Sequence, residues 1–87
     1  MREQYNTFLK KELKDLAVKT RKEQGITQRK MSEILEMNET SYSNIETGVY
    51  MCGTLTTVLL LMEQKDPSRY LKELELKFQE LEEGEEG

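Results

Sequence analysis

The stretch Gly25–Gly48, GITQRKMSEILEMNETSYSNIETG, holds two short patterns of apolar residues separated by a polar break. In the first pattern Met31 and Leu35 lie four residues apart, and in the second Tyr42 and Ile45 lie three residues apart. Each spacing places its pair on one face of an α-helix. Two helices of about two turns each, joined by about three residues, form a helix-turn-helix. The rest of the chain must supply the core, because so short a unit buries too little apolar surface alone.

Residues that favour helix ends border both patterns. Thr27 and Asn38 carry side-chain oxygens that can accept hydrogen bonds from free backbone N–H groups, so each is expected to cap the start of one helix. Gly25 suits the left-handed conformation that commonly ends a helix. The capping residues therefore agree with the apolar spacing.

The segments on both sides of this motif also carry helical patterns. Before it, apolar residues recur at helical spacing at Leu9, Leu13, Leu16 and Ala17. After it, residues 54–62 read TLTTVLLLM, which is apolar on more than one side of a helix. Such a helix is expected to be buried on two sides. Leu55, Val58, Leu59 and Met62 form the stripe expected to face the core, and the other side would face the C-terminal helix or another subunit.

The C-terminal segment begins with Asp66-Pro67, a favourable helix start. Apolar residues then recur at spacings of three, four and three, as two heptads of a seam formed by Leu71, Leu74, Phe78 and Leu81. Two heptads are too few for an independent coiled coil, so the seam packs either within the chain or across a dimer. If the seam packs across a dimer, the expected interface consists of these four residues together with Leu60 and Leu61. Residues 83–87 are acidic and are expected to be a disordered tail.

Composition excludes several classes of protein. The chain has 87 residues, one cysteine (Cys52) and no histidine, so an intrachain disulfide and a zinc finger are both excluded. No apolar run approaches the length needed to cross a membrane, and the polar N-terminus lacks the apolar region of a signal peptide. No Gly-rich phosphate loop or nucleophile–base pair indicates an enzyme. We expect a cytoplasmic, non-enzymatic protein without metal or cofactor and without a membrane partner.

The formal net charge of −4 is unevenly distributed along the chain. Residues 9–50 hold eight Lys or Arg against seven Asp or Glu, whereas residues 51–87 hold four against nine. Because contacts to nucleic-acid phosphates need Lys and Arg, the acidic total argues against nucleic acid at first sight. The surplus of Asp and Glu lies towards the C-terminus, however. A DNA-facing surface in the rest of the chain is therefore compatible with the negative net charge.

The motif resembles the helix-turn-helix of the Cro and phage-repressor superfamily, also called the xenobiotic-response-element type of bacterial regulator. The resemblance covers roughly residues 13–65, and its markers are Arg21, Ile26-Thr27-Gln28, Met31-Ser32, Leu35, Tyr42, Ile45-Glu46 and Gly48. Two features depart from the family pattern. Glu36 stands at a turn position where the family often has Gly, and the segment after Gly48 lacks the usual Asn-Pro.

The resemblance implies an all-α, lambda-repressor-like domain of five helices with the helix-turn-helix at the second and third. We expect this DNA-binding domain at residues 1–65, with the motif at 26–47 and a dimerising amphipathic helix at 66–82. The family also pairs Arg21 with Glu46 in a structural salt bridge, for which the planar guanidinium is well suited.

The third helix is the expected reading helix. The resemblance implies base-reading or adjacent contacts in the major groove for Asn38, Glu39, Thr40, Ser43 and Asn44. The chemistry agrees in part, since Asn44 can read adenine and Thr40 can contact the thymine methyl group. Glu39 can accept from cytosine, but phosphates repel its carboxylate unless it reads a base. The phosphate contacts are expected from Gln28, Arg29, Lys30 and Thr47. Alternatively, these side chains are only the solvated faces of amphipathic helices.

The function expected from this resemblance is sequence-specific binding of double-stranded DNA by a prokaryotic or phage transcription regulator. A homodimeric repressor on a palindromic operator is the favoured form. The alternative is an antitoxin or adaptor of the same fold that acts mainly on a protein partner, such as a toxin or another regulator.

Overall fold

The computed structural model describes residues 2–86, and the side chains of residues 3–84. The described chain forms five helices: α1 (Arg2–Gln24), α2 (Gln28–Ile34), α3 (Glu39–Glu46), α4 (Thr54–Met62) and α5 (Pro67–Glu86). No strand is present among these residues. The predicted all-α fold, with the helix-turn-helix at α2 and α3, is therefore confirmed. No helix in the described part of the chain is long and apolar enough to cross a membrane.

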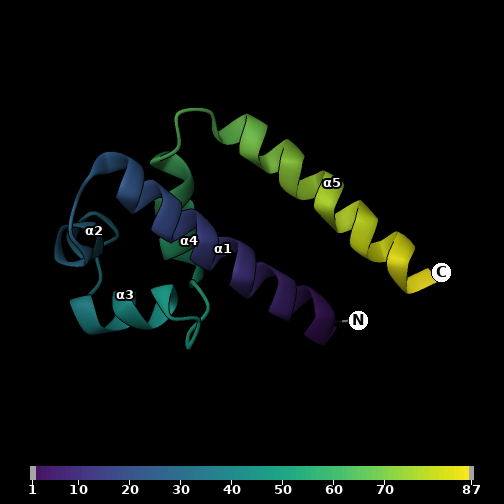
Figure 1. Ribbon diagram of the computed structural model, residues 1–87, viewed down its shortest axis with the longest axis horizontal. Helices are drawn as coiled ribbons and strands as arrows, with labels where there is room; N and C mark the ends of the chain where they lie inside the picture. Colours follow the sequence, from purple (N-terminus) through teal and green to yellow (C-terminus); the bar gives the residue numbers. More distant parts are fainter. Residues whose placement is uncertain (1, 87) are drawn as a thin grey trace.

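The short helices gather around one half of the long helix α1 (Figure 1). Helices α2 and α3 lie at the C-terminal end of α1, and α5 runs back alongside α1, so that both chain ends lie at the same end of the molecule. The main core cluster joins α1, α2, α3 and α4 through the buried residues Leu16, Ala17, Met31, Leu35, Tyr42 and Leu60. A second cluster holds Leu13, Ile45 and Cys52.

The caps and turns of the helix-turn-helix follow from its residues. Thr27 Oγ1 accepts a hydrogen bond from the backbone N–H of Lys30 at 3.1 Å, and Asn38 Oδ1 accepts one from Ser41 at 2.7 Å. Between the helices, Glu36 has a φ of +54°. This left-handed conformation costs a residue with a Cβ roughly 1–2 kcal/mol, which explains why the family often has Gly at this turn.

Replacing Glu36 with Gly is expected to raise the free energy of unfolding by about 0.5–1 kcal/mol. The relief of backbone strain exceeds the extra conformational entropy that Gly gives the unfolded chain. Urea denaturation measures the change. The matched control is Glu33→Gly within helix α2, which should destabilise by about 1 kcal/mol. Equal losses of unfolding free energy in both variants would show that the backbone at Glu36 is not strained.

Helix α5 continues to Glu86, which corrects the expected helix end at 82 and the expected disordered tail after it. The contacts of α5 with α1 lie just before this extension. The Phe78 ring lies 5.3 Å from that of Phe8 and 5.6 Å from that of Tyr5, and the Tyr5 hydroxyl donates to Glu82 at 3.1 Å. Disorder was predicted from the acidic composition of residues 83–87 alone, which does not show whether the preceding helix continues. Gly87 lies outside the described residues.

Candidate nucleic-acid interface

The polar face of α3 lies open beside the start of α2. Glu39, Thr40, Ser43 and Asn44 line a shallow polar hollow of about 430 Å³ together with Gln28. The structure therefore places four of the expected base-reading residues on one surface with an expected phosphate contact. Asn38 does not line this hollow, because its side-chain oxygen caps α3.

Two buried residues fix the rotation of α3 about its own axis. Tyr42 is 0% exposed and Ile45 is 3% exposed. In a helix, side chains three and four positions apart share a face, so anchoring these two residues turns the polar residues outward. The Tyr42 hydroxyl also donates to the backbone carbonyl of Ala17 at 3.4 Å, which ties α3 to α1.

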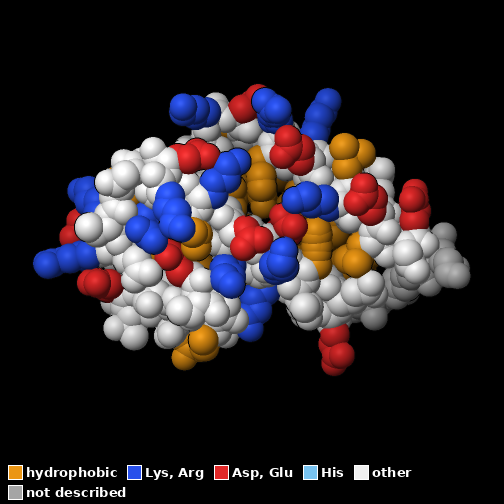
Figure 2. Space-filling view, viewed as in Figure 1, with side chains coloured by type: hydrophobic (Ala, Val, Ile, Leu, Met, Phe, Trp, Pro, Cys, Tyr) orange, Lys and Arg blue, Asp and Glu red, His pale blue; other side chains and the backbone are white. Residues whose placement is uncertain are grey.

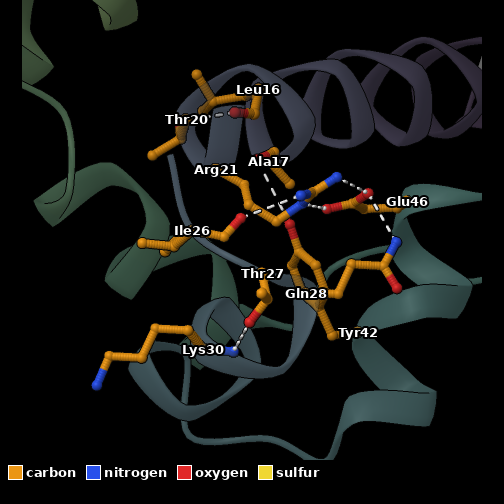
Figure 3. A network of polar contacts seen from close by, with 10 residues as sticks. All are labelled: Leu16, Ala17, Thr20, Arg21, Ile26, Thr27, Gln28, Lys30, Tyr42 and Glu46. Carbon is orange, nitrogen blue, oxygen red and sulfur yellow. Dashed lines mark hydrogen bonds and ion pairs between the residues drawn. The ribbon is translucent and has the colours of Figure 1, made fainter. Parts of the chain in front are cut away.

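A polar network joins α1, α2 and α3 behind this face (Figure 3). Arg21 Nε donates to Glu46 Oε2 at 2.6 Å, and Arg21 Nη2 donates to Glu46 Oε1 at 3.1 Å. Arg21 Nη1 also donates to the carbonyl of Ile26 at 3.1 Å. The paired side chains are only 19% and 7% exposed. The ion pair that the resemblance implied is therefore formed, and it ties the end of α3 to α1.

Electrostatics in this network favour the charged form of Glu46. Burial alone would raise the pKa of Glu46, but the neighbouring Arg21, Tyr42 and Gln28 outweigh burial and lower it. Burial is also the main reason that the pKa of Tyr42 is raised. Gln28 Nε2 donates to Glu46 Oε1 at 3.0 Å. Gln28 thus connects the ion pair to the polar hollow, and its position is fixed by its bond to Glu46.

The other expected phosphate contacts lie at the edges of the same region. Arg29 and Lys30 are exposed in the first turn of α2, where Lys30 forms a loose, exposed pair with Glu33 at 3.8 Å. Thr47 is exposed directly after α3 and donates to the carbonyl of Asn44 at 3.2 Å.

Sequence reasoning missed three lysines that the structure brings to the end of α3. Lys10, Lys11 and Lys14 of α1 line a hollow with Thr47 and Gly48. Their spacing shows that they share one side of α1. That side faces the end of α3 only because of the tertiary fold, so no local signal could have identified them.

The expected dimer interface needs one correction. Leu60 is 0% exposed and lies in the main core cluster, so it offers no surface to a second subunit. The outward side of α4 instead carries Leu55, Val58 and Met62, which are 62%, 48% and 70% exposed. The prediction that these three residues face the core is therefore wrong. We call these three residues the α4 stripe. Exposed Val49, Tyr50 and Met51 precede it in the loop after α3, where apolar side chains protrude from the surface (Figure 2).

The remaining residues of the expected interface face other helices of the same chain, although Leu71 is still 48% exposed. Leu61, Leu71 and Leu74 line an apolar groove of about 360 Å³ between α1, α4 and α5, and Phe78 packs against α1 as described above. Apolar side chains are visible between α1 and α5 in Figure 2. Leu81 is half-buried. Whether any of them also contacts a second subunit stays a prediction.

Five helices, a capped helix-turn-helix and an exposed polar face on α3 define a helix-turn-helix domain of the DNA-binding regulator class. A family model described as a helix-turn-helix domain matches residues 18–85, and the chain belongs to this family. The predicted relationship to Cro-type regulators is thereby confirmed. Comparisons with curated proteins and with solved structures give no match.

Proposed function

We propose that this protein is a sequence-specific, double-stranded DNA-binding transcription regulator that represses as a homodimer on a palindromic operator. The observation that carries this proposal is the exposed face of α3, where Glu39, Thr40, Ser43 and Asn44 share one surface with Gln28. Short polar side chains on an exposed helix suit direct contact with base edges in the major groove. The buried Arg21–Glu46 pair holds this helix in a fixed orientation.

Selection of random duplex DNA by the purified protein, followed by titration at two salt concentrations, tests the proposal. We expect an enriched palindrome whose half-sites lie about one helical turn, roughly 34 Å, apart. Binding should weaken steeply as salt rises, because phosphate contacts release counterions. Absence of enrichment, together with weak binding at low salt, would refute DNA recognition by this face.

The α4 stripe supports the homodimer. Three exposed apolar residues on one helix face, continued by the loop at residues 49–51, form a surface that a second copy can cover. Replacing Leu55 and Met62 with Glu should therefore give a monomer by analytical ultracentrifugation. Loss of simultaneous binding to two half-sites should weaken operator binding about 100-fold or more.

Leu76→Glu provides the control for this experiment. Leu76 is 59% exposed on α5, and its replacement adds charge without touching the α4 stripe. The Leu76 variant should remain dimeric. An unchanged dimer in the double α4 variant would exclude the stripe as the interface.

The apolar groove between α1, α4 and α5 favours a second candidate function, that of an antitoxin or adaptor acting on a protein partner. Its lining includes Leu9, Leu13 and Val58 in addition to the residues named above, and such a groove can accept apolar side chains of another protein. The selection experiment separates the two functions, because an adaptor that does not read DNA enriches no operator.

A further inference from the structure

A lysine cluster lies at the C-terminal end of the reading helix. Lys10, Lys11 and Lys14 project from α1 into a hollow of about 330 Å³ that also contains Thr7, Asp15, Thr47 and Gly48. Thr47 and Gly48 immediately follow α3. Lys and Arg side chains lie along the middle of α1 on the face shown in Figure 2, interspersed with Asp and Glu side chains. The cluster is therefore adjacent to the face of α3 that we propose reads DNA.

Packing holds one of these lysines in place. Gly48 has a φ of +82°, and a Cβ placed on it would lie 3.6 Å from Lys14 Cδ and 3.9 Å from Lys14 Nζ. The aliphatic stem of Lys14 thus lies against the turn that ends α3. Lys10 and Lys14 are both half-buried, which is typical of lysines that pack their stems and present their ammonium groups to solvent.

The charges of this cluster are incompletely neutralised. Lys11 pairs with Asp15 at 3.5 Å, and both side chains are exposed. Within residues 3–84, no carboxylate lies at ion-pair distance from Lys10 or Lys14. Two ammonium groups beside the end of α3 are thus available to an external anion.

The polar hollow and the lysine cluster are separate surfaces, because they share no lining residue. Gln28 donates to Glu46, the last residue of α3, and lines the polar hollow, whereas the lysine cluster lines a different hollow with Thr47 and Gly48. A helix placed in the major groove has a phosphate backbone on either side, so the two groups suit different phosphates.

We propose that Lys10 and Lys14 bind DNA phosphates at a second backbone-contact site, separate from the one expected at Gln28 and Arg29. The inference rests on the proposed DNA-binding function and adds residues of α1 to it. It also accounts for how a chain of net charge −4 can bind DNA. Lys10 and Lys14 lie beside the end of the reading helix, whereas most of the surplus of Asp and Glu lies in residues 51–87.

The test compares two double variants of the full chain that change the net charge equally. Lys10→Gln/Lys14→Gln removes the proposed contacts, and Lys65→Gln/Lys72→Gln removes two exposed lysines near and on α5, which lies across α1 from α3 (Figure 1). Each is titrated onto the duplex selected by the wild type, at several salt concentrations, by fluorescence anisotropy.

We expect the first variant to lower the slope of log K against log salt by about two and to weaken binding about 10-fold or more at 0.1 M salt. Its base preference should be unchanged, because phosphate contacts carry no sequence information. Ethylation interference should show that phosphates on one flank of each half-site no longer matter. The control variant should keep the wild-type slope.

Equal slopes and affinities for the two variants would overturn the inference, because only net charge would then matter. Wild-type slope and affinity in the Lys10 and Lys14 variant would overturn it as well, while leaving DNA binding intact. Failure of the wild type to bind any duplex at low salt would refute the proposed function and the inference together.

Discussion

Replacing Glu46 with Ala is expected to lower the free energy of unfolding by about 3 kcal/mol or more. The change leaves the Arg21 guanidinium, whose side chain is 19% exposed, without its carboxylate, and an unpaired buried charge costs far more than a well-packed apolar pair. Urea denaturation measures the loss. The double variant Arg21→Met/Glu46→Leu should regain most of the lost stability, because it removes both charges.

An exposed ion pair on α1, the helix that carries Arg21, provides the control. Lys19 and Glu23 lie 3.8 Å apart with side chains 71% and 60% exposed, and such surface pairs contribute roughly 0–1 kcal/mol. Glu23→Ala should therefore change stability by less than about 1 kcal/mol. Equal effects of Glu23→Ala and Glu46→Ala would mean that the buried pair has no special role.

The ion pair between Arg21 and Glu46 makes the free energy of unfolding depend on pH. The folded state lowers the pKa of Glu46 from its ordinary value of 4.5, so the stabilisation from its charge is fully present above that value. It is lost as the pH falls through the lower, folded-state pKa. The difference in unfolding free energy between the wild type and Glu46→Gln should therefore shrink below pH 4.5. A constant difference across that range would contradict the lowered pKa.

Replacing Asn44 with Ala is expected to relax the preference for one base pair of each half-site by about 1–3 kcal/mol. Asn44 lines the polar hollow beside Gln28, and its amide can form two hydrogen bonds with an adenine edge, which Ala cannot replace. Comparing the sequences selected by the variant and by the wild type measures the effect.

Arg29→Ala is the matched control for this prediction. Because a phosphate contact positions the protein without reading sequence, this variant should weaken binding to all duplexes alike and lower the salt slope by about one. An unchanged base preference in Asn44→Ala would remove Asn44 from the reading residues. A changed preference in Arg29→Ala would mean that Arg29 contacts a base.

Local patterns were sufficient to predict the helix-turn-helix. The spacing of Met31, Leu35, Tyr42 and Ile45 identifies its two buried faces, and Thr27 and Asn38 form the predicted caps. Both signals act within a few residues of the chain, so they are readable without the fold. The contact of Arg21 with Glu46 spans 25 residues and was expected only through family resemblance.

Packing between distant segments accounts for the rest. A helix that is apolar all round has no unique inner face, so the sequence could not show that Leu60 enters the core while Leu55, Val58 and Met62 face outward. Likewise, Phe78 of α5 packs against the Tyr5 and Phe8 side chains of α1, and α5 continues past residue 82. The nearness of Lys14 to Gly48 also depends on how α1 crosses α3. These features arise from contacts between residues far apart in the chain. The periodicity of a single helix contains no information about such contacts.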